Sequence, residues 1–178
     1  MRGLVRVGAA VPSLALGNVK ENMKRHLAMM REAKEKHVSI VTFPELSLTG
    51  YTCGDLFFQR RLLDDVTDAL LALKDEMPEG ILAVVGAPLE IEGALYNCAV
   101  VLHKGEIISA VPKTFLPNNG EFYEKRWFQS GDARRDASVA IPKLKTDVCR
   151  QAIFETEDGV CFGIELCEDL WAPLPPST

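Results

Sequence analysis

The chain has 178 residues, of which 47% are hydrophobic and 25% are charged, and its formal net charge at pH 7 is -5. This length and apolar content suffice for one substantial core, so we expect a single domain over residues 1–178. The acidic balance, without a dense run of Lys or Arg or a Gly-rich phosphate loop, argues against nucleic-acid binding. Five cysteines without a C-x-x-C pair favour reduced thiols, and the three histidines show no metal-ligand spacing.

The amino terminus has some features of a secretion signal. Basic residues flank the start of the apolar stretch 7–16, and Ala15-Leu16-Gly17 loosely imitates a signal-peptidase site. Pro12 interrupts that stretch, however, and residues 4–11 fit equally well as a first buried strand. No run approaches the length of a transmembrane helix. We therefore predict a cytoplasmic protein without membrane contact.

Two helices and a strand are predicted in the first half. Asn18 and Glu21 match a capping box, and apolar residues then recur at helical spacing until His37. The β-branched run 38–43 predicts a strand. A second helical pattern covers residues 62–73 and ends before a proline.

Several short strands are predicted in the second half. The apolar runs lie at residues 81–85, 95–102, 106–111, 139–141, 152–155 and 160–166. Turns rich in glycine separate several of them. Residues 112–135 form a long, mostly polar connection, which is typical of a functional or flexible loop. Helices alternating with strands predict a layered α/β domain.

Three reactive side chains stand directly after predicted strands. They are the carboxylate of Glu45, the ammonium of Lys113 and the thiol of Cys167. In an open α/β sheet the carboxyl ends of the strands lie along one edge, which is where such sheets bind ligands. We therefore expect these three groups to meet in one pocket.

Together the three groups suit nucleophilic catalysis. A carboxylate beside a thiol acts as general base, and a cation or backbone N–H stabilises the oxyanion that follows. Glu45 is then the base, Lys113 the cation and Cys167 the nucleophile. Taken alone, a cysteine is most often a small buried hydrophobe, and a lysine after a proline is an ordinary surface residue. The combination is what points to catalysis.

The sequence around these residues resembles the nitrilase superfamily of carbon–nitrogen hydrolases, whose catalytic Glu, Lys and Cys occur in this order. The matching segments are Phe43-Pro44-Glu45-Leu46, Pro112-Lys113 and Glu165-Leu166-Cys167-Glu168-Asp169. Further segments are similar to the amidase domain of glutamine-dependent NAD synthetases, and with them the similarity spans nearly the whole chain. These are residues 50–57, 113–118, 122–128 and 167–171.

The resemblance implies a nitrilase-type α-β-β-α sandwich. The sequence stops shortly after Cys167, without a helix to cover the strand that carries it. We therefore expect only the first part of the domain, with its remainder and an ATP-dependent synthetase domain absent.

The resemblance also implies roles for individual residues. Glu45 matches the general base, Lys113 the oxyanion-stabilising lysine, and Cys167 the nucleophile that forms a thioester with the γ-carbonyl of glutamine and releases ammonia. Glu121 falls where the superfamily often has a second catalytic glutamate that orients the lysine.

Three further positions are implied to contact the substrate. The backbone N–H of Glu168 would complete the oxyanion hole, and Tyr51 lies where the pocket wall is expected. Asn119 occupies a position at which some relatives carry an aromatic residue that touches the substrate.

The implied function is hydrolysis of L-glutamine to supply ammonia for the ATP-dependent amidation of deamido-NAD to NAD. No cofactor is implied for this chain, and ATP and Mg belong to the synthetase domain. The implied partners are glutamine, that synthetase domain and a second copy in a homo-oligomer, and we expect the isolated fragment to be inactive. Two alternatives remain open: a stand-alone amidase or nitrilase, and an inactive truncated interaction module.

Overall fold

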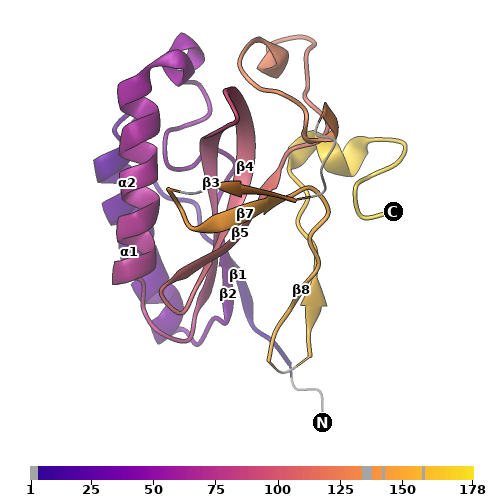
Figure 1. Ribbon diagram of the computed structural model, residues 1–178. Helices are drawn as coiled ribbons and strands as arrows, with labels where there is room; N and C mark the ends of the chain where they lie inside the picture. Colours follow the sequence, from indigo (N-terminus) through magenta and orange to yellow (C-terminus); the bar gives the residue numbers. More distant parts are fainter. Residues whose placement is uncertain (1–3, 134–137, 142, 158) are drawn as a thin grey trace.

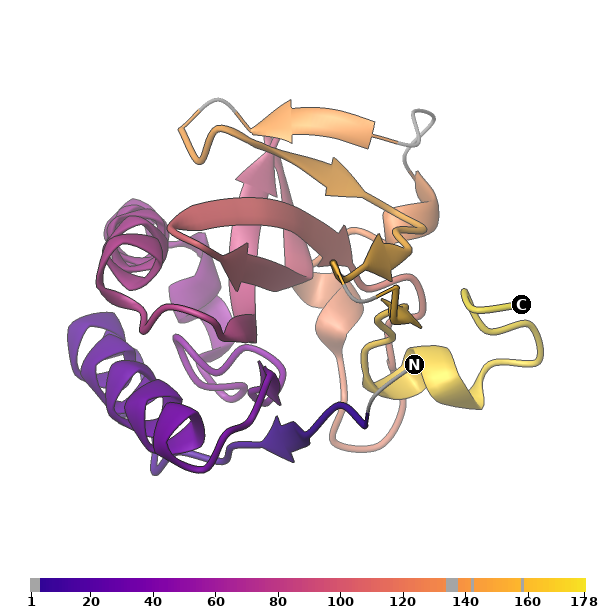
Figure 2. The ribbon, with the colours of Figure 1, turned by 90° about the horizontal axis from the view of Figure 1, so that it is seen from below.

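A seven-stranded mixed sheet forms the centre of the computed structural model, which describes residues 4–133, 138–141, 143–157 and 159–178. The strand order is β1-β2-β3-β4-β5-β7-β6. The strands are β1 (Val7–Ala9), β2 (Ile40–Thr42), β3 (Leu82–Ile91), β4 (Ala94–His103), β5 (Glu106–Pro112), β6 (Ser138–Ile141) and β7 (Thr146–Cys149). Helices α1 (Val19–Glu35) and α2 (Arg60–Glu76) lie side by side on one face of the sheet (Figures 1 and 2).

Helix α1 begins where the capping pattern predicts. The Asn18 side chain accepts a hydrogen bond from the backbone N–H of Glu21 at 3.1 Å, which satisfies one of the unpaired donors of the first turn. Val19, Leu27 and Met30 recur at helical spacing and are buried in the main core. The capping signal and the apolar period together therefore account for this helix.

A buried histidine joins α1 to the segment that follows β2. Nδ1 of His26 lies 2.7 Å from the carbonyl oxygen of Asn22, and Nε2 lies 2.8 Å from the hydroxyl of Ser47. Because a carbonyl only accepts, Nδ1 carries the proton and Nε2 accepts from Ser47. Burial lowers the pKa of His26 from 6.5 to about 4, so the ring is neutral at pH 7.

The segments after β2 and β5 leave the sheet at the same edge. Strand β2 is parallel to β3, and β4 is antiparallel to both β3 and β5, so β5 has the direction of β2. Strands β3 and β4 are buried along almost their whole length, as expected for central strands covered on both faces. Of the three strand ends predicted to converge at one edge, those of β2 and β5 do so.

The face of the sheet opposite the helices carries a smaller apolar cluster. It consists of Val84, Ala99, Val101, Val111 and Leu166. Strand β8 (Phe154–Glu155) pairs antiparallel with β9 (Cys161–Phe162), and this short hairpin lies on that side (Figure 1). Phe154 packs against the cluster and stacks on Phe162 with ring centroids 5.2 Å apart. This hairpin therefore leads the chain across the second face toward Cys167.

Several strand predictions were wrong in extent. Residues 160–166 do not form one strand, because β9 pairs only with the two residues of β8 and the chain then continues unpaired. Strand β1 has three residues rather than eight, and Val7 is 68% exposed because β1 is an edge strand. Strand β3 extends to Ile91, since it pairs with β4 through a tight turn at Glu92 and Gly93.

Within the described residues, no helix combines the length and apolar character needed to cross a membrane.

Candidate functional site

The loop after β2 holds Glu45 close against β3. Leu46 adopts a left-handed backbone conformation (φ 52°), and the N–H of Leu48 donates to the carbonyl of Gly86 at 3.0 Å. The N–H of Gly86 donates in turn to the Ser47 hydroxyl at 3.3 Å. A Cβ added at Gly86 would lie 2.4 Å from the nitrogen of Leu46 and 2.4 Å from the carbonyl oxygen of Pro44. Only glycine therefore permits this approach.

We expect Gly86→Ala to displace Glu45 and to lower the alkylation rate of the Cys167 thiol at least about tenfold at neutral pH, because the obstructing atoms are backbone. The rate is measured with iodoacetamide and peptide mapping. Gly93→Ala is the control, since no atom lies within 4 Å of the Cβ added at Gly93, whose positive φ gives that variant backbone strain without obstruction. A Gly86→Ala protein that alkylates at the rate of the parent would contradict this prediction.

A buried ammonium lies between two carboxylates. Lys113 directly follows β5, and its side chain is completely buried. Its Nζ lies 2.6 Å from Oε1 of Glu45 and 2.7 Å from Oε1 of Glu124. The side chain of Glu45 is 16% exposed and that of Glu124 is 2% exposed. Charges this deeply buried require partners, and here each partner is a carboxylate.

Two neutral side chains extend this network. The hydroxyl of Tyr51 donates to Oε1 of Glu124 at 2.6 Å. The amide nitrogen of Asn97 donates to Oε1 of Glu45 at 2.5 Å. Burial, together with the neighbouring Glu124, raises the pKa of Tyr51, so the phenol stays protonated and remains a donor. The carboxylate oxygens nearest Lys113 therefore each accept two hydrogen bonds.

Cys167 opens a short 3₁₀ helix, η4 (Cys167–Trp171), in a strained backbone conformation. Its φ is 48°, in the left-handed region that a non-glycine residue rarely adopts. Asp169 is buried, and its carboxylate accepts from the backbone N–H groups of Thr114 at 3.1 Å, Phe115 at 2.7 Å and Leu166 at 3.2 Å. These bonds hold the segment around Cys167 against the loop that follows Lys113.

The electrostatics keep the thiol protonated in the resting site. Partial burial raises the pKa of Cys167, and the carboxylates of Glu45 and Glu124 act in the same direction. The ammonium of Lys113 and the backbone N–H of Glu168 oppose this shift, because both favour the thiolate. Because the net shift of the Cys167 pKa is upward, the thiol stays protonated and requires a base to become a nucleophile.

Glu45 has the protonation behaviour that such a base requires. Burial raises the pKa of its carboxyl, although Lys113 and Asn97 act against the shift. For Lys113, burial lowers the pKa, but the two carboxylates outweigh it and the net direction is upward, so the ammonium stays charged. The site thus combines a protonated thiol, a carboxylate that accepts a proton readily and a fixed cation. That set can activate a thiol and stabilise an oxyanion.

One predicted site residue is corrected by the structure. Glu121 was expected to orient Lys113, but Glu124 holds that place and Glu121 is exposed. The N–H of Glu124 donates to the carbonyl of Pro117 at 3.1 Å, and this turn leaves Glu121 on the outside. Phe128, four residues after Glu124, is also buried. The spacing of four residues from an apolar position could have indicated from the sequence that Glu124, rather than Glu121, faces inward.

The three residues predicted to contact the substrate differ in whether they contact this network. Tyr51 is bonded into it, and the N–H of Glu168 faces the sulfur of Cys167. Glu168 also lines a hollow of about 360 Å³ together with Trp171. Asn119 lies in an exposed turn and has no bond to the catalytic groups among the described residues.

Besides Glu124, two site residues were not found from the sequence. Asn97 is the fully buried amide within the apolar strand β4, and a polar residue at such a position was a usable signal. Asp169 is part of the matched segment around Cys167, but its role depends on backbone groups more than fifty residues away in the chain.

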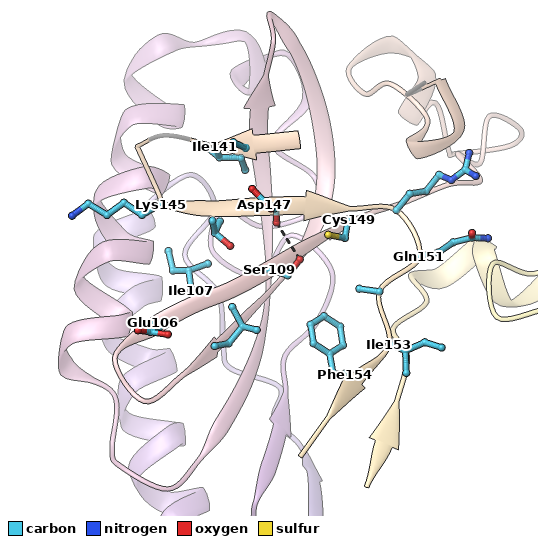
Figure 3. Close-up of a pocket in the computed structure, with 15 residues that line it drawn as sticks. Glu106, Ile107, Ser109, Ile141, Lys145, Asp147, Cys149, Gln151, Ile153 and Phe154 are labelled. Carbon is cyan, nitrogen blue, oxygen red and sulfur yellow. Dashed lines mark hydrogen bonds between the residues drawn. The ribbon is translucent and has the colours of Figure 1, made fainter. Parts of the chain in front are cut away.

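A hollow of about 930 Å³ lies elsewhere, between β5, β7 and residues 150–154 (Figure 3). The hydroxyl of Ser109 donates to the carbonyl of Asp147 at 3.1 Å across its floor. Neither Glu45, Lys113 nor Cys167 lines it. Size alone therefore does not identify the candidate site.

Known proteins match both the sequence and the fold. The glutamine-dependent NAD(+) synthetase of Mycobacterium tuberculosis (strain ATCC 25618 / H37Rv) is 38% identical over 178 residues, which is 98% of this chain and 26% of that protein. The chain thus spans about a quarter of the length of this relative.

Two solved structures extend the comparison. A glutamine-dependent NAD(+) synthetase from Cytophaga hutchinsonii superposes with a TM-score of 0.83 and 28% identity over 92% of this chain and 28% of that one. An amidase from Nesterenkonia sp. shares the fold with a TM-score of 0.72 at 17% identity, over 95% of this chain and 57% of the amidase. The predicted nitrilase-type α/β fold is confirmed.

The carbon–nitrogen hydrolase family model matches residues 6–176, which includes every residue of the network around Lys113. The chain therefore belongs to the carbon–nitrogen hydrolase family.

Proposed function

We propose that this chain is the glutaminase portion of a longer enzyme, in which it hydrolyses the side-chain amide of L-glutamine through a thioester on Cys167, and that the ammonia released serves the ATP-dependent conversion of deamido-NAD to NAD. The observation that carries the proposal is the buried ammonium of Lys113 between Glu45 and Glu124, beside a thiol whose pKa responds to all three groups. The relatives that match nearly the whole chain are named glutamine-dependent NAD(+) synthetases, which supports glutamine as the amide.

The acylation half begins with proton transfer from the thiol of Cys167 to the carboxylate of Glu45. The sulfur attacks the amide carbonyl carbon, and the electron pair of the C=O bond moves to oxygen. That oxyanion is stabilised by the Lys113 ammonium and the backbone N–H of Glu168. Glu45 then returns the proton to the leaving nitrogen, the C–N bond breaks, and ammonia departs from a γ-glutamyl thioester.

Deacylation repeats the sequence with water. Glu45 takes a proton from the water, whose oxygen attacks the thioester carbon, and the same oxyanion contacts apply. Collapse of this intermediate expels the Cys167 thiolate, which recovers its proton from Glu45, and releases glutamate. Glu45 is therefore the base and the acid in both halves, which suits a carboxyl with a raised pKa.

The test is direct detection of the thioester. After the full-length enzyme that contains this chain is mixed with L-glutamine and quenched with acid, we expect one γ-glutamyl group on the peptide that contains Cys167, together with stoichiometric ammonia. Cys161→Ala is the matched control, because Cys161 is also exposed but lies outside the network. Hydrolysis of simple amides or nitriles without any glutamine adduct would favour a stand-alone amidase or nitrilase, and a Cys167 that never acylates would favour an interaction module.

Further expectations rest on the same proposal. An ATP- and Mg-dependent synthetase domain is the proposed acceptor of the ammonia. The homo-oligomeric state and the cytoplasmic location stay predictions.

A further inference from the structure

Asn97 is a fully buried amide in the middle of an otherwise apolar strand. Its neighbours along β4 are buried and mainly hydrophobic, and its own exposed fraction is 0%. Burying an amide in such a position is unfavourable unless its hydrogen bonds are made. The position of Asn97 therefore requires an explanation beyond packing.

The two carboxylates of the site fix how this amide is oriented. Its nitrogen lies 2.5 Å from Oε1 of Glu45 and 3.5 Å from Oε2 of Glu124. Carboxylate oxygens accept hydrogen bonds, so the NH₂ group rather than the carbonyl of Asn97 must face them. The amide oxygen is then buried without a hydrogen-bond partner among the described residues. The amide oxygen of Asn97 thus lacks a hydrogen bond within the described part of the chain, while the NH₂ group of the same side chain donates to Glu45.

The two oxygens of Glu45 consequently have different surroundings. Oε1 accepts from both Asn97 and the Nζ of Lys113, at 2.5 and 2.6 Å. The backbone N–H of Lys113 also donates to the carbonyl of Asn97 at 2.8 Å, so this asparagine also fixes the point at which Lys113 leaves the sheet. With Oε1 occupied, Oε2 is the oxygen left to exchange a proton.

We propose that Asn97 is a positioning residue for the amide hydrolysis: with Lys113 it saturates Oε1 of Glu45 and thereby assigns proton transfer from Cys167 to Oε2. The inference rests on the proposed function. Asn97 acts through Glu45 and does not touch the substrate. Because its amide is neutral, it holds the carboxylate in place without adding the repulsion that a third charged group would bring.

The same contact also affects the pH at which Glu45 works. The hydrogen bond from Asn97 lowers the pKa of Glu45 and so opposes the upward shift that burial causes. A general base acts in its ionised form, so activity is lost as the pH falls through its pKa. Removing the Asn97 donor raises that pKa and moves the acid limb of the rate profile to higher pH.

The experiment compares Asn97→Leu and Asn97→Asp, which keep the approximate shape of the side chain. We expect kcat for glutamine to fall about 10- to 100-fold with KM changed less than about threefold. The acid limb of the rate–pH profile should move to higher pH. The upward move should be larger for Asn97→Asp, because a third carboxyl then faces Glu45 and Glu124. Asn22→Asp is the matched control: Asn22 is equally buried, and its amide nitrogen bonds only backbone carbonyls, of Ala15 and Leu48.

A second readout, the pH dependence of Cys167 alkylation by iodoacetamide, needs no glutamine. If the full-length enzyme that contains this chain fails to hydrolyse glutamine, the proposed function is wrong, but the alkylation profile still tests Asn97. An acid limb that stays in place in both Asn97 variants, or one that moves equally in Asn22→Asp, would overturn the assignment of Asn97.

Discussion

We expect Cys167→Ala to lower kcat for glutamine hydrolysis by at least about 10⁴-fold and to abolish the γ-glutamyl adduct. The reason is that no other side chain of the network is an effective nucleophile toward an amide: Lys113 is held as an ammonium, Tyr51 stays protonated, and carboxylates such as Glu45 and Glu124 attack amides poorly. Glutamine binding, measured calorimetrically, should persist, since the missing atom contributes to bond formation rather than to recognition.

Stability measurements separate this loss from misfolding. The backbone of residue 167 has a φ of 48°, which is as strained for alanine as for cysteine but unstrained for glycine. We therefore expect Cys167→Gly to unfold with a free energy about 1 kcal/mol higher than Cys167→Ala, although both are inactive. In a preparation that also carries the synthetase reaction, NAD formation from added ammonia should continue in both variants. Loss of the ammonia-driven reaction would mean that the thiol is structural or that the two reactions are tightly coupled.

The positions of the proposed catalytic carboxylate, ammonium and thiol were predictable because each follows a segment whose sequence pattern is local. Glu45 and Lys113 come after runs that form β2 and β5, and the parallel direction of these strands brings their ends to one edge. The structure places Cys167 beside Glu45 and Lys113 as predicted, but residues 160–166 before it do not form the predicted strand. Its position depends on the bonds of Asp169 to Thr114 and Phe115, which no local pattern reveals.

The remainder of the network depends on contacts between distant segments. Glu121 and Glu124 lie in the same polar connection, and only the turn closed at Pro117 decides which of them enters the core. Asn97 interrupts an apolar strand, a signal that indicates an unusual position but does not name its partner. Strand β7 (Thr146–Cys149) was missed because a short run with alternating polar residues forms a strand only through its pairing with β5 and β6.

Replacing Glu124 should have a large effect on activity, and replacing Glu121 should not. We expect Glu124→Gln to reduce kcat for glutamine about 10²- to 10³-fold, while Glu121→Gln stays within about twofold of the parent. Glu124 is 2% exposed at its side chain and holds both the Lys113 ammonium and the Tyr51 hydroxyl, whereas Glu121 is exposed. The two variants change the same functional group three residues apart, so each controls for the other.

The pH dependence shows whether Glu124 acts through Lys113. Burial lowers the pKa of Lys113, and the two carboxylates raise it above the ordinary value. Glu124→Gln removes one of these carboxylates, so the ammonium should lose its proton at a lower pH. Because the oxyanion requires the charged lysine, the alkaline limb of kcat should move to lower pH in Glu124→Gln, and Glu124→Asp should restore part of the difference. An unchanged alkaline limb in Glu124→Gln, or an equal loss of activity in Glu121→Gln, would show that Glu124 does not set the charge of Lys113.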